Sequence, residues 1–261
     1  MNAAIVTGAG GGGCGRSIAR RLARDGATVV VSDVHEPGGV ETVRLIREDG
    51  GRASFVPADV RDEAQLSGLV DAAARLGDLQ ILVNNASAPQ PTADGIAGWT
   101  NVIATDFLGA MHATRYAVEA MRRAGGGSIV NITSISALWQ GRTTPGGFNG
   151  YDVAKMALIR MTTVLAPDLA KDGIRINCLA PGWIATDGPR QYWESLSPEE
   201  RKARGVPATL LAPEQVADIV ARIASDRALN GRIVVWWSED RPRLVRWGDR
   251  GYAGFDSYSE T

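Results

Sequence analysis

Residues 3–15 read AAIVTGAGGGGCG, and residues 16–23 continue as RSIARRLA. The first four residues are apolar and suit a strand buried on both faces, whereas the apolar positions after the glycines recur at helical spacing. A strand, a glycine-rich turn and a helix form the context of a dinucleotide site, because glycines let the backbone approach a pyrophosphate and the helix N-terminus faces its negative charge. The residues of this turn that we expect at the cofactor are Gly8, Gly13, Cys14 and Gly15.

A flexible glycine linker is the alternative interpretation of this turn. A linker would not lie between a buried strand and an amphipathic helix, so we favour the cofactor site. The turn also lacks the Gly-Lys-Ser/Thr ending of a nucleoside-triphosphate loop.

A second apolar run covers residues 28–32 and ends at Asp33. This aspartate lies about 20 residues beyond Gly15, where an acidic residue of a dinucleotide fold accepts from the adenosine ribose 2′-hydroxyl. Its charge would also repel a 2′-phosphate. The sequence therefore predicts NAD as the cofactor, with a simple turn aspartate as the alternative.

Strand-like and helix-like segments alternate along the rest of the chain. Further strands are expected over residues 53–58, 79–83, 128–133, 174–180 and 232–237, and helices over 40–48, 63–76, 97–123, 149–171 and 213–224. Six or seven strands alternating with helices predict a single α/β domain over residues 1–261, with a doubly wound parallel sheet of about seven strands. We expect residues 187–212, which are polar with aromatic side chains among them, to form a substrate lid, and 238–261 to form a C-terminal tail.

Residues 134–155 carry the expected chemistry. Tyr151 and Lys155 are four residues apart near the start of a predicted helix, so they share a helix face. A lysine ammonium lowers the pKa of a neighbouring phenol, and Ser134, at the end of the preceding strand, is placed to hydrogen-bond the same substrate oxygen. Such a pair alone is more often a solvated surface pair. Here the glycine turn and Asp33 also follow strands, and ligands of doubly wound sheets bind at that edge.

Composition and charge exclude several classes of partner. The chain has 261 residues and a net charge of −1, so no overall field attracts nucleic acid or an anionic membrane. Its start lacks the pattern of a signal peptide, and no apolar run approaches the roughly 18 residues of a spanning helix. Cys14 and Cys178 are too isolated to form a metal-ligand pattern. We therefore expect a cytoplasmic protein without a metal, acting on a small molecule.

The tail interleaves arginines with aromatic residues. This mixture occurs in sites for single-stranded nucleic acid, but neighbouring acidic residues cancel the positive charge here. A packed tail or a subunit contact is the favoured interpretation.

Together these features resemble the short-chain dehydrogenase/reductase family over about residues 3–237. The matching motifs are Thr7-Gly8 with Gly13 and Gly15, Asp59-Val60, Asn84-Asn85-Ala86, Ser134, Tyr151 with Lys155, and Pro181-Gly182 with Thr186. The resemblance implies a Rossmann fold and hydride transfer between a nicotinamide cofactor and a carbon–oxygen bond. It also implies a homotetramer, or else a homodimer, assembled through the two long helices.

The resemblance further implies a role for each motif. Tyr151 would be the general acid/base, Ser134 would position the substrate oxygen, and Lys155 would bind the nicotinamide ribose and lower the Tyr151 pKa. The other cofactor contacts that it implies are Asp59 and Val60 at the adenine, the pairs Asn85-Ala86 and Pro181-Gly182, and Ile184 with Thr186 at the carboxamide.

The sequence departs from the family pattern at four places. The glycine turn is one residue longer than usual, and the segment from Ser134 to Tyr151 is also longer. Ser87 stands where the family commonly has glycine, and Asp106 stands where it often has a fourth catalytic residue, asparagine. An ionised carboxylate only accepts hydrogen bonds, so Asp106 can replace that asparagine only with a backbone N–H as partner or when protonated. Local bending or capping of the helix is the alternative.

The leading hypothesis is an NAD-dependent alcohol dehydrogenase or carbonyl reductase. A catalytically silent dinucleotide sensor is one alternative, but Tyr151 and Lys155 are both retained. An epimerase or dehydratase on the same fold is another, but such relatives usually carry a larger substrate domain. Aromatic residues that suggest a pocket for a bulky or cyclic alcohol, with simple packing as an equally strong alternative, are Trp139, Phe148, Trp183, Tyr192 and Trp193.

Overall fold

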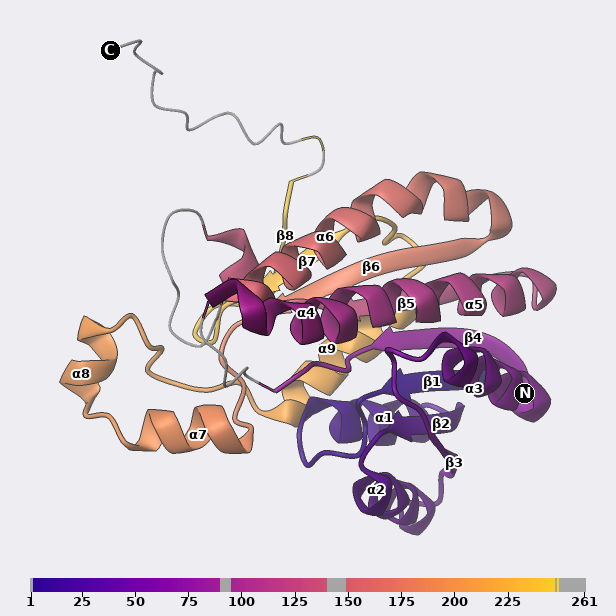
Figure 1. The fold of residues 1–261 in the computed structure, drawn as a ribbon, viewed down its shortest axis with the longest axis horizontal. Coiled ribbons are helices and arrows are strands. Elements are labelled where there is room, and N and C mark those ends of the chain that lie inside the picture. Colours follow the sequence, from indigo (N-terminus) through magenta and orange to yellow (C-terminus); the bar gives the residue numbers. More distant parts are fainter. Residues whose placement is uncertain (1, 90–94, 140–148, 247, 249–261) are drawn as a thin grey trace.

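The computed structural model describes residues 2–89, 95–139, 149–246 and 248. Its centre is an eight-stranded sheet in the order β3-β2-β1-β4-β5-β6-β7-β8 (Figure 1). The strands are β1 (Asn2–Thr7), β2 (Thr28–Asp33), β3 (Arg52–Pro57), β4 (Asp78–Asn84), β5 (Gly127–Ile132), β6 (Ile174–Pro181), β7 (Ile233–Trp236) and β8 (Arg243–Leu244). Strands β1 to β7 are parallel, which confirms the predicted doubly wound α/β sheet. The short β8, which was not expected, pairs antiparallel with β7 and comes from the tail.

Helices cover both faces of this sheet (Figure 1). They are α1 (Cys14–Arg24), α2 (Glu36–Glu48), α3 (Glu63–Leu76), α4 (Trp99–Ile103), α5 (Ala110–Arg123), α6 (Asn149–Leu169), α7 (Asp187–Glu194), α8 (Pro198–Ala203) and α9 (Pro213–Ser225). Side chains of α1, α2 and α9 share one core cluster with the sheet, and side chains of α3, α5 and α6 share the other. In β1, Ala4 and Val6 face the first cluster and Ile5 faces the second, which explains why this strand is apolar throughout.

The strand order reverses at β1, which pairs with β2 on one side and β4 on the other. Loops that leave neighbouring strands at this point run to opposite faces of the sheet, and the space between them is where doubly wound sheets bind ligands. The glycine turn follows β1, Asp33 ends β2, and Asn85 follows β4. The fold therefore brings these predicted cofactor residues to one place.

Two segments differ in detail from the expected elements. The helix expected over residues 97–123 consists of α4, a π-helical segment at Ala104–Gly109, and α5 in succession. The segment expected to be a lid contains α7 and α8, and it packs around its own buried cluster of Trp183, Leu196 and Val206. Among the described helices, none is long and apolar enough to cross a membrane.

Candidate active site

A cleft of about 660 Å³ opens at the reversal point of the sheet. The predicted cofactor residues that line it are Gly8, Gly13, Cys14, Gly15, Asp33, Asp59, Val60, Asn85, Ala86 and Thr186. Five predicted cofactor residues do not line the cleft: Tyr151, Lys155, Pro181, Gly182 and Ile184. Gly11, which was not among the predicted cofactor residues, also lines the cleft.

Close backbone contacts explain why the turn is made of glycine. Gly8 has a φ of +66°, and a Cβ there would lie 2.7 Å from the Cα of Ala86. A Cβ on Gly15 would lie 2.2 Å from the carbonyl oxygen of Gly8, too close for any side chain. The Asn85 amide donates to the carbonyl oxygens of Thr7 (2.9 Å) and Gly8 (3.0 Å), so Asn85 fixes the turn from behind.

Asp33 holds the glycine turn as well as lining the cleft. Its carboxylate accepts from the backbone N–H of Gly10 at 2.8 Å and of His35 at 2.9 Å. The N–H of Gly10 therefore already has an acceptor in Asp33. The nearby Arg16 guanidinium donates to Thr42 and to two backbone carbonyls. This end of the cleft therefore carries the Asp33 carboxylate, with the Arg16 guanidinium nearby on uncharged partners.

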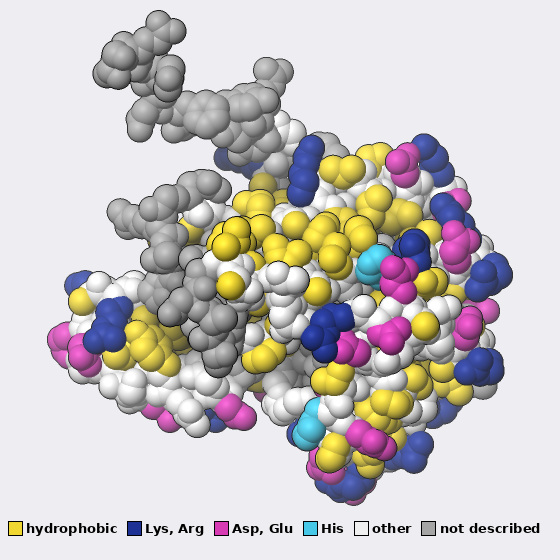
Figure 2. All heavy atoms as spheres, in the orientation of Figure 1, with side chains coloured by type: hydrophobic (Ala, Val, Ile, Leu, Met, Phe, Trp, Pro, Cys, Tyr) yellow, Lys and Arg dark blue, Asp and Glu magenta, His cyan; other side chains and the backbone are white. Residues whose placement is uncertain are grey.

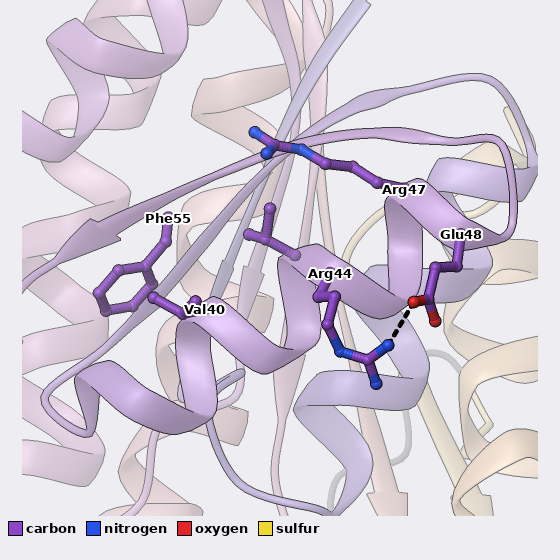
Figure 3. A pocket seen from close by; sticks show the side chains of 6 residues that line it. Val40, Arg44, Arg47, Glu48 and Phe55 are labelled. Carbon is purple, nitrogen blue, oxygen red and sulfur yellow. Dashed lines mark hydrogen bonds and ion pairs between the residues drawn. The ribbon is translucent and has the colours of Figure 1, made fainter.

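A second hollow, between α2 and β3, is not an extension of this cleft (Figure 3). Arg44 in its wall is paired with Glu48 and Glu41, and Arg47 donates to the carbonyl oxygen of Ala53. Arg44 is thus neutralised by two carboxylates, whereas the partner of Arg47 is an uncharged carbonyl.

Lys155 lies buried at the centre of a polar cluster on α6. Its ammonium is 5.2 Å from the centre of the Tyr151 ring and donates to the carbonyl oxygen of Ile132 at 3.2 Å. It also forms an ion pair with Asp106 at 3.0 Å, and the two side chains are only 3% and 0% exposed. The structure thus brings Tyr151, Lys155 and Asp106 together, and Ser134 joins them through its hydrogen bond with Tyr151.

The ionisation of Tyr151 reflects these neighbours. Burial raises the pKa of its phenol, the Lys155 ammonium lowers it, and the Asp106 carboxylate raises it again, so that the net direction is upward. Lysine acts in the expected sense, but burial and Asp106 outweigh it. Burial lowers the pKa of Lys155, but Asp106 and Tyr151 more than offset this and keep the ammonium charged.

Asp106 has the backbone partner that its predicted role requires. The N–H of Ala88 donates to one carboxylate oxygen at 2.7 Å, and the Ser87 hydroxyl donates to the other at 2.5 Å. Asp106 sits in the π-helical segment, a local widening often found at functional sites. The two departures from the family pattern at 87 and 106 are therefore in direct contact.

Ser134 connects Tyr151 to a second polar group. The side-chain hydrogen bond between Ser134 and Tyr151 acts to lower the pKa of Tyr151. The Ser134 hydroxyl also lies 2.9 Å from the hydroxyl of Ser136, which in turn donates to Asp152 at 2.5 Å. Ser136 and Asp152 were not predicted from the sequence. The only signal was their position, because Ser136 is two residues after Ser134 and Asp152 directly follows Tyr151.

The aromatic residues proposed for the substrate pocket divide into two groups. Trp183 stacks on Tyr192 at 5.8 Å, and the Trp193 indole donates to the carbonyl oxygen of Pro207, so these three hold the lid segment together. Trp139 is 45% exposed at the end of a short helix that begins after Ser134. Phe148 lies outside the described residues.

The remaining predicted contacts lie at the end of β6. Ile184 pairs with Leu211, the N–H of Thr186 donates to the Ile184 carbonyl at 2.8 Å, and a Cβ on Gly182 would press on Trp237 at 3.1 Å. Within the ranges that the structure describes, no three His, Cys, Asp or Glu side chains gather as a metal site.

Comparison with known proteins agrees with this geometry. A family model described as short chain dehydrogenase matches residues 2–197. The cis-4-hydroxycyclohexanecarboxylate dehydrogenase of Sinomonas cyclohexanicum is 38% identical over 231 residues, which are 86% of this chain and 90% of that protein.

Two solved structures are similar throughout. One is a 7α-hydroxysteroid dehydrogenase with NADH and 7-oxo glycochenodeoxycholic acid (TM-score 0.77, 30% identity, 90% of this chain and 92% of that one). The other is an actinorhodin polyketide ketoreductase with NADPH (TM-score 0.79, 30% identity, 90% and 95%). The chain is thus a nicotinamide-dependent oxidoreductase acting between alcohols and carbonyls, and it belongs to the short-chain dehydrogenase/reductase family.

Proposed function

We propose that this protein uses NAD to interconvert a cyclic secondary alcohol and its ketone. The observation that carries the proposal is the placement of Tyr151 between a buried Lys155 ammonium and the Ser134 hydroxyl. A phenol with a cation on one side and a hydroxyl on the other is suited to proton transfer at a carbon–oxygen bond.

The choice of NAD rests on Asp33. Its carboxylate lines the cleft, and its two backbone donors leave acceptor capacity for a ribose hydroxyl. A 2′-phosphate at the same place would meet a negative charge and no unpartnered cation among the described lining residues, since Arg61 is paired with Asp59. The relatives include enzymes bound to NADH and to NADPH, so the proposal depends on this residue.

The reaction follows from the side chains of this chain. A bound nicotinamide supplies the hydride acceptor. In alcohol oxidation Tyr151 takes the hydroxyl proton, Ser134 hydrogen-bonds the same oxygen, and the Lys155 ammonium stabilises the phenolate. Asp106 fixes that ammonium by its ion pair. We assign Gly11, Gly13 and the other lining residues of the glycine turn to the pyrophosphate, with Asp59 and Val60 at the adenine. Residues 181–186 are assigned to the nicotinamide end.

A ring-shaped substrate is favoured by the relatives. The relative from Sinomonas is described as acting on a hydroxycyclohexane ring, and one of the similar structures contains a steroid. Trp139, exposed at the end of the short helix that Ser134 caps, offers a flat apolar surface for such a ring.

We further propose that the protein works in the cytoplasm as a homotetramer or homodimer. Hydrophobic side chains gather over α5 and α6 on the face shown in Figure 2. Val153 and Val164, both on α6, are 44% and 53% exposed, as expected for a helix that a second subunit covers.

A substrate panel tests the proposed function. Cyclopentanol, cyclohexanol and a hydroxysteroid are offered with NAD and NADP in parallel, and absorbance of the reduced nicotinamide is followed. Turnover of a cyclic alcohol with NAD, lost in Tyr151→Phe, supports the proposal. Cofactor binding without turnover of any alcohol or ketone would favour the silent sensor instead.

A further inference from the structure

A chain of hydrogen bonds leads from the catalytic serine away from the site. The Ser134 hydroxyl contacts the Ser136 hydroxyl at 2.9 Å, and the Ser136 hydroxyl donates to the Asp152 carboxylate at 2.5 Å. The backbone N–H of Ser136 also donates to the Ser134 oxygen at 3.2 Å. Asp152 is half-buried on α6, directly after Tyr151.

Counting protons along this chain fixes its direction. A hydroxyl has one proton to donate, and an ionised carboxylate has none. Ser136 gives its proton to Asp152, so Ser134 must be the donor between the two serines. Ser134 then has a lone pair, and no proton, to offer on the side of Tyr151 and the substrate.

We propose that Asp152, acting through Ser136, sets which way the Ser134 hydroxyl points, and so whether Ser134 can donate a hydrogen bond to the oxygen of a bound ketone. The inference rests on the proposed function. When Asp152 takes up one proton, it donates to Ser136, Ser136 donates to Ser134, and the proton of Ser134 is released toward the carbonyl oxygen. The carboxylate gains one proton from solvent, and the two serine hydroxyls rotate about their C–O bonds without breaking an O–H bond.

The surroundings of Asp152 favour the protonated form of its carboxyl. Burial raises the pKa of the Asp152 carboxyl, and the hydrogen bond from Ser136 opposes this. The neighbouring charged groups are Lys155 and Asp106, which, like Asp152, act on the pKa of Tyr151. No described cation forms an ion pair with Asp152.

Ser136→Ala is the sharpest test, because it removes the hydroxyl link and keeps the backbone N–H to Ser134. KM and kcat for cyclohexanone and cyclohexanol are measured with NADH and NAD from about pH 4 to pH 8, which spans the range of a raised carboxyl pKa. The equilibrium constant of the overall reaction fixes the ratio of kcat/KM for alcohol oxidation to kcat/KM for ketone reduction. KM and kcat are therefore compared separately. In the wild type, the ketone KM should rise by about three- to tenfold as Asp152 ionises, the worth of one hydrogen bond.

Ser136→Ala and Asp152→Ala should both give a ketone KM that no longer changes with pH. Asp168→Asn is the matched control, because it removes another α6 carboxylate that is exposed and paired with Lys171; it should behave like the wild type. NADH fluorescence titration reports whether each variant keeps its fold and cofactor site.

Three outcomes would overturn the inference. They are a pH-dependent ketone KM that survives in Ser136→Ala, a wild-type ketone KM that does not change with pH, and an equal rise of ketone and alcohol KM, which a structural role would produce. A wild type that turns over no alcohol or ketone would instead refute the proposed function.

Discussion

Replacing Asp106 by asparagine should move the basic limb of the pH–rate profile to lower pH. The Asp106 carboxylate is 3.0 Å from the Lys155 ammonium, which is 5.2 Å from the Tyr151 ring. The carboxylate is therefore within about 8 Å of the phenol, where a unit charge at an effective dielectric constant of about 20 is worth roughly 2 kcal/mol, or about 1.5 pKa units. The Asp106 carboxylate raises the pKa of Tyr151, so its removal lowers that pKa.

Residual water in the site reduces this figure, and we expect a shift of about one unit. The assay is kcat/KM for alcohol oxidation against pH in the wild type and in Asp106→Asn. The amide cannot accept from both Ala88 and Lys155, because one of its two ends is a donor, so kcat should fall modestly as well. Ser87→Ala is the control, since it removes a hydrogen bond to Asp106 but leaves the charge.

Three results would refute this reasoning. A basic limb that moves upward in Asp106→Asn would show that the carboxylate does not oppose the phenolate. Near-complete loss of turnover with intact NAD binding would show that Asp106 has a chemical role of its own. A shift of equal size in Ser87→Ala would mean that hydrogen bonding, and not charge, sets the pKa of Tyr151.

Four further predictions concern catalysis, cofactor choice, the glycine turn and assembly. Tyr151→Phe should lower kcat by about a hundredfold or more, the scale of a lost general acid/base, with NADH fluorescence titration unchanged; near-normal turnover would contradict the assignment. Asp33→Asn should raise the NADP to NAD ratio of kcat/KM, because the repelling charge is lost, and an unchanged ratio would argue against the role of Asp33. Gly15→Ala should abolish NAD binding in calorimetry, whereas Gly12→Ala, whose Cβ meets nothing nearer than 3.9 Å, should retain it; equal behaviour would refute the steric argument. Light scattering should show a tetramer or dimer that Val164→Asp weakens, and a wild-type monomer at micromolar concentration would exclude the proposed assembly.

The sheet and the cofactor edge could be predicted from the sequence because their signals are local. A continuous apolar run such as residues 3–6 indicates a strand buried on both faces, and alternation with helices then gives the parallel sheet. The eighth strand could not be anticipated, since Arg243 and Leu244 are exposed and show no strand periodicity. They pair because β7 would otherwise present a free edge.

The catalytic cluster was predictable in its members but not in its connections. Tyr151 and Lys155 stand at a fixed spacing of four, and Ser134 ends the preceding predicted strand, whereas the partners of Asp106 come from a different loop, at Ser87 and Ala88. Contacts between residues far apart in the chain depend on how the loops turn, which no local pattern encodes. The net upward shift of the Tyr151 pKa also depends on burial, which is a property of the folded site.

The two backbone hydrogen bonds to Asp33 bear on how this enzyme's cofactor preference can evolve. The carboxylate that would select the ribose also anchors Gly10 of the phosphate-binding turn and the N–H of His35. A mutation to a small apolar residue would leave two amide protons without acceptors, at about 1–3 kcal/mol for each that stays buried. For a protein that uses NAD as proposed above, a change toward NADP would therefore favour residues that keep a side-chain oxygen, such as asparagine or serine. Fewer substitutions at Asp33 are tolerated than repulsion of a 2′-phosphate alone would allow, because the side chain also accepts from two backbone N–H groups.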